Sequence, residues 1–501
     1  MGLPLNQRLG YSVGHVLNDL TASVWFSYLI VYFHQVMNFN NNLAGYLMLI
    51  GQVSDALFTP FIGYESDNTR GFCRLGKRKS WHLVGTICVA CSYPFVFNDC
   101  ITCSNAPDWS KFIYFAPFVV IFQFGWASTQ ISHLSLIPDL TQDENERVEL
   151  NGIRYAFTVL SNLAVFGIFW LLFLVHGDKS DSTEKQLSSV DALKFRNLVF
   201  IVVGMGLVFS IAFHFIVREP VQHEDLSAAE NAYADGYSTS IEKSTVLHSR
   251  MTWSCWLKTM QFYQIALVYM CTRLFVNVSQ IYLPLYVTET LRLPKDTVAI
   301  CPLVVYVSGF IASIAMRPIN SILGRKASVA NVLGLFFGVG ACGWIYFLNE
   351  GNARQVYGAV VLLGLGGSTM LVTSLAMTSD LIANNVESGA FVYGAMSFTD
   401  KLSNGVAVVL IQHLHPCISC CPSCQGYYRL VLTFVPGGVA AVAFLALLTL
   451  LPSKIGVRSN NENALKKPAH GSEGDNSDSD EERRPLLGNR ITQNTSIMNT
   501  S

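Results

Sequence analysis

Long apolar segments recur along the chain as far as residue 452. A helix that crosses a membrane needs about 20 mostly apolar residues. Twelve segments have this character: 11–34, 43–64, 81–97, 112–137, 152–176, 197–217, 262–288, 297–316, 328–348, 356–378, 389–412 and 430–452. Runs such as LVVYVSGFIASIAM have no polar face, whereas a membrane β-barrel would show short alternating segments. The pattern predicts an all-α membrane protein with twelve transmembrane helices.

The composition agrees with a chain that lies largely in lipid. Of its 501 residues, 51% are hydrophobic and only 13% are charged. That charged share is about half of what a soluble globular domain carries. The formal net charge is −1, so nothing in the charge balance indicates a nucleic-acid partner. We therefore expect the lipid bilayer to be the main surrounding of the first 452 residues.

Basic residues in short loops predict the orientation, because loops on the cytosolic side are enriched in Lys and Arg. They gather after the second and eighth spans, which lie on the same side if the spans alternate. These residues are Arg70, Arg74, Lys77, Arg78 and Lys79, and then Arg317, Arg325 and Lys326. We therefore expect this side, and both termini, to face the cytosol.

The two halves of the chain resemble each other. LGKRKSWHLVG at 75–85 enters the third span, and LGRKASVANVLG at 323–334 enters the ninth. Transporters are often built from two such repeats, with the binding site near the midplane between them. We predict a six-helix half at 1–217, a polar cytosolic linker at 218–261, a second six-helix half at 262–452 and a disordered tail at 453–501.

Several stretches carry a family resemblance over roughly residues 8–452. DALFTPFIGYESDNTRGFCRLGKRKSW at 55–81 resembles the signature between the second and third spans of the major facilitator superfamily, in its sugar:cation symporter branch. GHVLNDL in the first span, ERVELNGIRYAF before the fifth and GAFVYGAMSFTDKLSNG in the eleventh also fit this branch. FQFGWASTQISHLSLIPDL and HPCISCCPSC are similar to animal members of lysosomes and melanosomes that import cysteine and affect pigmentation.

The resemblance implies a major facilitator fold and a secondary transporter with no enzymatic activity and no cofactor. The implied substrate is a small polar solute, cysteine, moved from the cytosol into lysosomes or melanosomes by alternating access. Two other functions stay open: a lysolipid or other solute symporter of the same branch, and a membrane thiol oxidoreductase. Nothing in the chain resembles an ATP-binding loop, so a nucleotide-driven pump is not expected.

Ionisable residues inside the spans are candidate site residues, because a charge in hydrocarbon is costly and usually faces a cavity or the bundle interior. The candidates are Asp19, Asp55, Arg154, Arg273 and Lys401. In related symporters an acid at the position of Asp19 contacts substrate; the alternative is a packing carboxylate paired with Arg154 or Lys401. Arg154 lies near the cytosolic interface and can snorkel to water. Lys401 lies mid-span and needs a buried counter-charge from Asp19 or Asp55.

Asp55 is followed four residues later by Thr59, on the same helix face. The symporter branch usually has two acids at this spacing, and two carboxylates can hold a hard cation such as sodium. One carboxylate and one hydroxyl make a poorer cage. Thr59 therefore speaks against sodium symport and against the lysolipid carrier, whereas Asp55 alone still allows a proton to be carried.

Gln130 and His133 are three residues apart in the fourth span and share a helix face. Their side chains are able to hydrogen-bond a polar ligand. A satisfied contact between helices is the alternative.

Six cysteines fall in two loops on the predicted luminal side: Cys100, Cys103, Cys417, Cys420, Cys421 and Cys424. An even number in an oxidising compartment favours disulfides, which we take as the interpretation. The HLHPCISCCPSC run also resembles a cluster of metal ligands, and C-x-x-C is also a redox pattern. We expect no resident metal, and the sequence leaves the connectivity open.

The polar tail contains Glu482 followed by Leu486 and Leu487. An acid, three residues and two leucines on a cytosolic tail resemble lysosomal and melanosomal sorting signals. Paired leucines suit an apolar pocket and the acid a basic patch, as in adaptors of the clathrin type. We expect this sorting machinery to be a partner and the protein to reside in lysosome and melanosome membranes.

Overall fold

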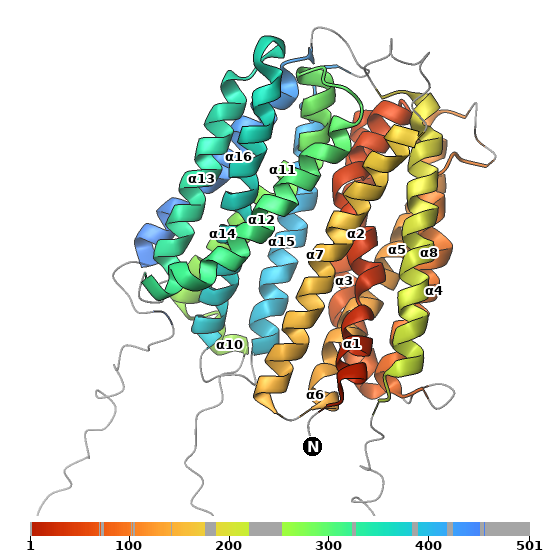
Figure 1. Cartoon of the computed structure of the whole chain (residues 1–501), viewed down its shortest axis with the longest axis vertical. Helices are drawn as coiled ribbons and strands as arrows, with labels where there is room; N and C mark the ends of the chain where they lie inside the picture. The colour runs from red at the N-terminus through yellow and green to blue at the C-terminus, as the bar shows by residue number, and fades with distance from the viewer. Residues whose placement is uncertain are drawn as a thin grey trace, which may run out of the picture. The chain divides into compact units, whose positions relative to one another are not determined.

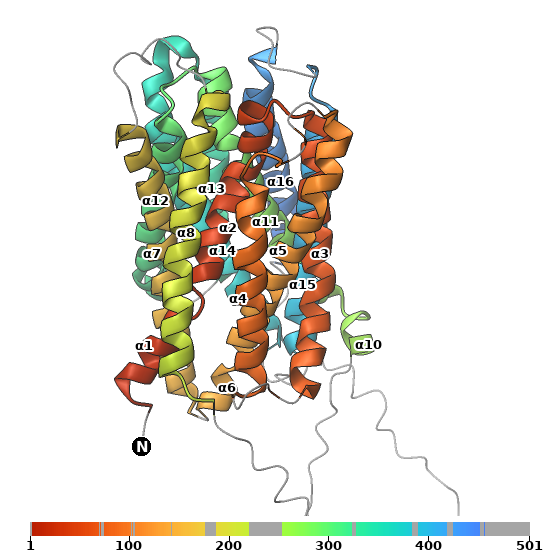
Figure 2. The ribbon, with the colours of Figure 1, turned by 90° about the vertical axis from the view of Figure 1, so that its right-hand side faces the viewer.

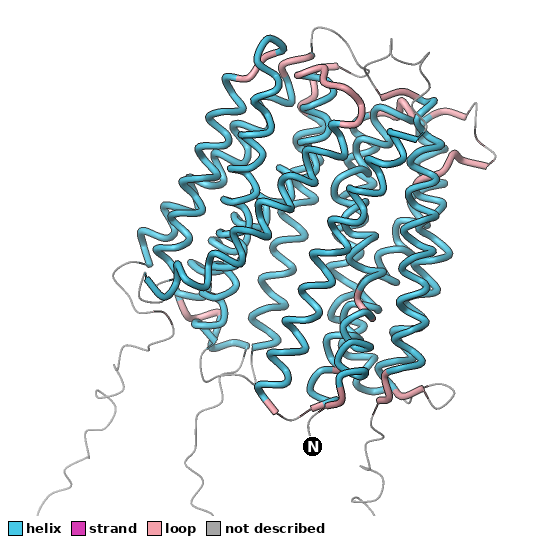
Figure 3. The backbone as a smooth tube through the Cα atoms, viewed as in Figure 1, coloured by secondary structure: helices cyan, strands magenta, loops and turns pink. Residues whose placement is uncertain are grey.

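The computed structural model describes residues 3–69, 71, 75–101, 103, 106–141, 143–175, 187–219, 253–322, 327–382, 389–417, 424–450 and 455, all within the compact unit Met1–Gly456. Helices make up every regular element in this part of the chain (Figure 3). The first-half elements are α1 (Leu5–Val13), α2 (Val16–Val31), η1 (Tyr32–Val36), α3 (Asn41–Asn68), α4 (Lys77–Val96), α5 (Asp108–Ser135), α6 (Ile137–Leu140), α7 (Glu144–Val175), η2 (Ser189–Asp191) and α8 (Ala192–Ile216).

The second half repeats this arrangement. Its elements are α10 (Trp253–Trp256), α11 (Met260–Leu285), η3 (Tyr286–Thr290), α12 (Thr297–Ile322), α13 (Ala327–Phe347), η4 (Glu350–Gln355), α14 (Val356–Ile382), α15 (Gly389–His413) and α16 (Tyr427–Leu450). Each predicted span after the first corresponds to one long helix. Ten helical segments among the described residues are apolar enough to cross a membrane. The other two predicted spans, α4 and α15, have 20 and 25 residues but are more polar.

The repeat extends to backbone details at equivalent places in the two halves. The first long helix of each half ends in a π-helical turn, η1 after α2 and η3 after α11. Each turn is followed by a non-glycine residue with positive φ, Asn38 at 49° and Arg292 at 51°. Such backbone is uncommon for residues other than glycine. Its occurrence at matching positions supports two six-helix repeats.

The halves meet along three pairs of helices. α2 packs against α11, α3 against α15, and α7 against α12. Figures 1 and 2 show these helices side by side between the outer helices of the two halves. Large apolar side chains point outward from the outer helices, among them Phe215, Phe336 and Phe347, which are more than 70% exposed. Lipid is the surrounding in which such a surface is favourable.

We call the end of the bundle where α1 begins the N-terminal end, and the opposite end, where η1 and η3 lie, the far end (Figure 1). Contacts between the halves close the far end. Gln35 of η1 donates to Thr288 of η3 over 2.8 Å, and Asn41 donates to the Cys417 carbonyl over 3.1 Å. The Lys295 ammonium lies 3.1 Å from Asp191.

Two boundaries differ from the sequence prediction. The first span was expected at 11–34, but helix runs from Leu5 to Val36 with a break at Gly14 and His15. The linker was expected to reach residue 261, but Trp253–Trp256 is helical and α11 already begins at Met260. Trp256 is buried in the core of the second half, and this apolar anchor explains why helical structure starts earlier than the polar composition indicated. Residues 220–252 and most of the predicted tail lie outside the described residues.

Candidate functional site

An ion pair joins the halves near the middle of the bundle. The Lys401 ammonium on α15 lies 2.7 Å from Oδ2 of Asp55 on α3. Both side chains are shielded, with 11% and 6% of their surfaces exposed. The sequence required a buried counter-charge for Lys401 from Asp19 or Asp55, and Asp55 supplies it. Helices from opposite halves are thus tied together by charge where solvent screens poorly.

Thr59 completes this group, because its place one turn after Asp55 puts both side chains on one face of α3. Its hydroxyl donates to Asp55 Oδ1 over 3.1 Å and accepts from Lys401 Nζ over 3.0 Å. The ammonium therefore sits against one carboxylate and one hydroxyl. A positive charge of the protein itself occupies the position beside Asp55 where the symporter resemblance placed a cation.

Aromatic and amide side chains of the first half surround this pair. Lys401 Nζ lies 5.7 Å from the centre of a Trp126 ring, within the range of a cation–π contact. Asp55 also borders a cavity of about 10 Å³, room for about one water molecule. Its lining is Ala22, Trp25, Phe26, Gln52, Asp55, Phe122, Gln123 and Trp126. A larger cavity of about 780 Å³ lies between α4 and α8 and touches neither Asp55 nor Lys401.

Asp19 belongs to a second polar group, formed within the first half. Its Oδ2 accepts from the Thr158 hydroxyl of α7 over 2.9 Å and lies 3.0 Å from His15 Nδ1. Nη2 of Arg154 lies 3.3 Å from the other His15 ring nitrogen. The direct pairing of Asp19 with Arg154 or Lys401, which the sequence offered as an alternative, is therefore not formed, because His15 lies between the first two and Asp55 takes Lys401.

Arg154 keeps one buried donor without a partner. Its Nε is shielded from solvent and has no hydrogen bond to any described residue. A buried, unsatisfied donor of a cationic group is costly. An anionic ligand arriving beside His15 would satisfy it.

A third polar group lies within the second half. Arg273 Nε on α11 donates to Asp400 Oδ2 of α15 over 2.8 Å, and the Asn277 amide donates to Asp400 Oδ1 over 3.2 Å. Asp400 and Lys401 are adjacent, yet they face different helices, as their helical spacing predicted. Arg273 thus has a structural partner.

The second and third groups occupy matching helices of the two repeats with their charges reversed. In the first half the acid is on α2 and the cation on α7, whereas in the second half the cation is on α11 and the acid on α15. All four helices belong to the three pairs along which the halves meet.

His133 lies beside the Asp19 group, with its ring centre 5.5 Å from that of His15. His133 is fully buried, stacks on Tyr11 at 4.2 Å between ring centres, and its Nε2 lies 2.7 Å from the Tyr11 carbonyl oxygen. His133 thus contacts a neighbouring helix, while its Nδ1 is buried without a hydrogen bond to a described residue. Gln130 is half-buried.

The four described loop cysteines lie at the far end. Cys100 is bonded to Cys103, and Cys417 to Cys424. Cys420 and Cys421, and the tail residues Glu482, Leu486 and Leu487, lie outside the described residues.

Sequence reasoning did not single out His15, Trp126, His34 or Glu289, and it covered His415 only as part of the HLHPCISCCPSC run. His15 and His34 lie near the two ends of the first predicted span, and a histidine at a span end is a weak signal that could have pointed to them. Trp126 and Glu289 become candidates only when helices distant in sequence are placed together.

Among the described residues, twelve helical spans in two repeats, with opposite charges meeting between them, are the architecture of a membrane transporter for a small solute. A family model described as MFS/sugar transport protein matches residues 10–414. The chain belongs to this family of the major facilitator superfamily.

The chain is similar to curated animal proteins over nearly its whole length. It is 48% identical over 459 residues to major facilitator superfamily domain-containing protein 12 of Homo sapiens, covering 90% of this chain and 94% of that protein. With the protein of the same name from Mus musculus it shares 46% over 467 residues, 92% of this chain and 96% of that one.

Among solved structures, the xylose transporter XylE from E. coli in an inward open conformation superposes with a TM-score of 0.59 at 13% identity. The match covers 91% of this chain and 98% of that one. At this identity it shows the major facilitator fold alone.

Proposed function

We propose that this transporter carries cysteine from the cytosol into lysosomes and melanosomes, independently of sodium. Independence from sodium is supported by the contact of Lys401 Nζ with Asp55 and Thr59. The Lys401 ammonium would repel a sodium ion at this position. Asp55 and Thr59 alone also supply too few oxygen ligands to enclose one.

A zwitterionic amino acid fits the charges that face the region between the halves. Its carboxylate needs a cation, for which Arg154 offers an unpaired Nε and Lys401 an ammonium. Its ammonium needs an acid, which Asp19 supplies on α2.

Alternating access follows from the way the halves are linked. The far end is closed by contacts of η1 with η3, and the Asp55–Lys401 pair holds α3 to α15 at mid-bundle. A substrate carboxylate that competes with Asp55 for Lys401 would loosen the link between the halves. Substrate binding at the Asp55–Lys401 pair would thus favour a rearrangement of the two halves.

We propose that the N-terminal end faces the cytosol and the far end faces the lumen, as the basic loops predict. In an acidic lumen protons run downhill toward the cytosol, so proton symport would oppose import. Exchange, or uniport along the substrate gradient, would not.

The test is uptake by vesicles that contain the purified full-length protein. Labelled cysteine, cystine and a lysolipid are offered separately, each in sodium and in choline buffers of equal ionic strength. We expect saturable uptake of cysteine alone, equal in both buffers. Uptake that requires sodium would overturn sodium independence, and uptake of cystine or lysolipid without cysteine would overturn the substrate.

A further inference from the structure

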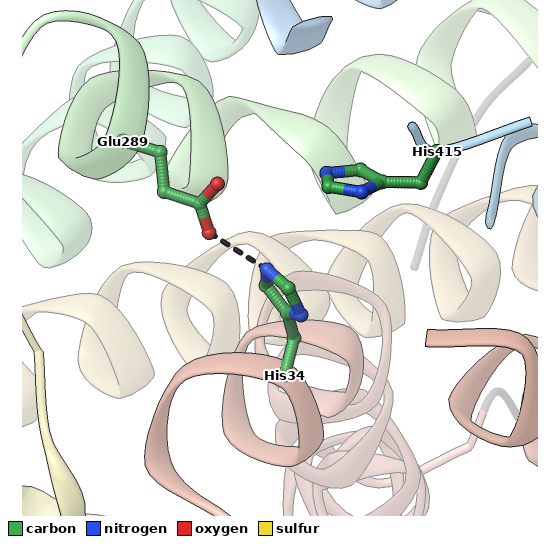
Figure 4. A group of neighbouring side chains, drawn as sticks. All are labelled: His34, Glu289 and His415. Carbon is green, nitrogen blue, oxygen red and sulfur yellow. Dashed lines mark ion pairs between the residues drawn. The ribbon is translucent and has the colours of Figure 1, made fainter. Parts of the chain in front are cut away.

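Three potential metal ligands meet at the far end, outside the polar groups described above. They are His34 of η1, Glu289 of η3 and His415, two residues after the end of α15. One ligand atom from each lies within 4.8 Å of the others. Figure 4 shows the three side chains pointing toward one another from separate segments of the chain.

Within this group, His34 and Glu289 are in direct contact. His34 Nε2 lies 2.9 Å from Glu289 Oε1, and their side chains are 2% and 11% exposed. The Gln35 amide donates to the same carboxylate oxygen over 3.0 Å and orients it. Carboxylates that bind metals are commonly oriented by a neighbouring hydrogen-bond donor in this way.

His415 contributes a ring nitrogen that lacks a partner. Its Nδ1 lies 2.7 Å from the Cys417 carbonyl oxygen, to which it donates in the tautomer that leaves a lone pair on Nε2. This Nε2 is shielded from solvent and has no hydrogen bond to a described residue. Histidines that bind metals are commonly oriented in this way by a carbonyl. The Cys417–Cys424 disulfide restrains the segment that supplies it.

We propose that His34, Glu289 and His415 form a site for a transition-metal dication of the Zn²⁺ type, which bridges the two halves and holds the far end closed. Two imidazoles and one carboxylate are a set that zinc accepts, with bonds of about 2.0–2.2 Å and a fourth position for water. Calcium and magnesium prefer oxygen ligands and do not suit this set.

The positions of the three ligands explain how a bound ion would hold the far end closed. His34 belongs to the first half, whereas Glu289 and His415 belong to the second. The three side chains can reach one ion only while η1 and η3 are in contact. An ion bound here therefore favours the far-end-closed conformation over any state in which the halves separate at this end.

The test uses the purified full-length protein in detergent at pH 7.5, titrated with ZnCl₂ and, separately, with MgCl₂. Bound metal is counted by calorimetry, and thermal unfolding is followed with and without metal. We expect one Zn²⁺ per chain, a raised Tm with zinc and none of this with magnesium. His34→Ala and His415→Ala should each weaken zinc binding at least tenfold.

Two controls separate this site from other ligands. His413→Ala removes an exposed histidine at the end of α15, two residues before His415, and should leave zinc affinity unchanged. Cys420→Ser with Cys421→Ser removes thiols near His415 in sequence and should also leave it unchanged. If a histidine variant folds poorly, the wild-type titration still decides whether the site exists.

Absence of saturable zinc binding in the wild type would overturn the proposal. So would equal affinity in the wild type and in folded His34→Ala and His415→Ala variants, or loss of binding in the cysteine variant, which would assign the ion to thiols. Because metal is measured directly without substrate, these outcomes do not depend on the proposed transport of cysteine.

Discussion

At the scale of single residues, Asp55 and Lys401 contribute to thermal stability as a pair. Removing one partner leaves a buried charge uncompensated, which typically costs about 3–5 kcal/mol. Lys401→Met or Asp55→Asn should therefore lower the Tm markedly, whereas the double variant should recover much of the loss. Thermal unfolding in detergent measures the difference.

The same variants separate stability from function. Cysteine uptake should be abolished in Lys401→Met and should stay absent in the more stable double variant, because the cation that binds the carboxylate is missing. Restored uptake in the double variant would show that Lys401 acts only as a structural partner of Asp55.

Asp19 gives a second residue-scale prediction. A charge-assisted hydrogen bond to a substrate ammonium contributes about 1.5–3 kcal/mol, so Asp19→Asn should weaken cysteine binding roughly tenfold to a hundredfold at a normal protein level. Uptake kinetics and a blot of the membrane fraction measure both quantities. Asp108→Asn, at the start of α5 and away from the three polar groups, is the matched control and should behave as the wild type.

At the scale of elements, close helix pairs depend on small residues. A Cβ at Gly366 of α14 would lie 2.6 Å from the Gly338 backbone nitrogen of α13, and one at Gly85 of α4 would lie 2.6 Å from the Gly125 carbonyl of α5. Backbone cannot move aside as a flexible side chain can, so helices in lipid use small residues at such crossings. The two halves thus solve the same packing problem at the same pair of helices.

A prediction follows from this crossing. Gly366→Leu should force α13 and α14 apart and strongly reduce the yield of folded protein. Gly340→Leu on α13, where no atom lies within 4 Å of an added Cβ, should leave the yield near that of the wild type. Size-exclusion profiles of both variants after detergent extraction measure the effect. Equal profiles would contradict the tight crossing.

At the scale of the whole molecule, location is a property separate from the fold. The tail carries Glu482, Leu486 and Leu487, which we propose as the signal read by sorting adaptors. Leu486→Ala with Leu487→Ala should move the protein from lysosome-like organelles to the plasma membrane without changing its Tm. Fluorescence microscopy of the full-length protein is the measurement, and Leu465→Ala in the same tail is the control. Unchanged organelle staining would assign sorting to another signal.

The sequence by itself determined the membrane class, the twelve helices and the two repeats. Long apolar runs have few alternatives in lipid, where backbone groups must be satisfied within the helix. The sequence also limited the partner of Lys401 to Asp19 or Asp55, because a mid-span ammonium requires an acid.

Only the tertiary structure decided which charges meet. Lys401 pairs with Asp55 across the halves, Asp19 meets His15 and Thr158, and His133 stacks on Tyr11. The group of His34, Glu289 and His415 likewise exists only in three dimensions, because its members come from segments far apart in the sequence. Helical periodicity fixes which face of its own helix a residue occupies, but the partner of that face depends on how α2, α3, α11 and α15 pack together.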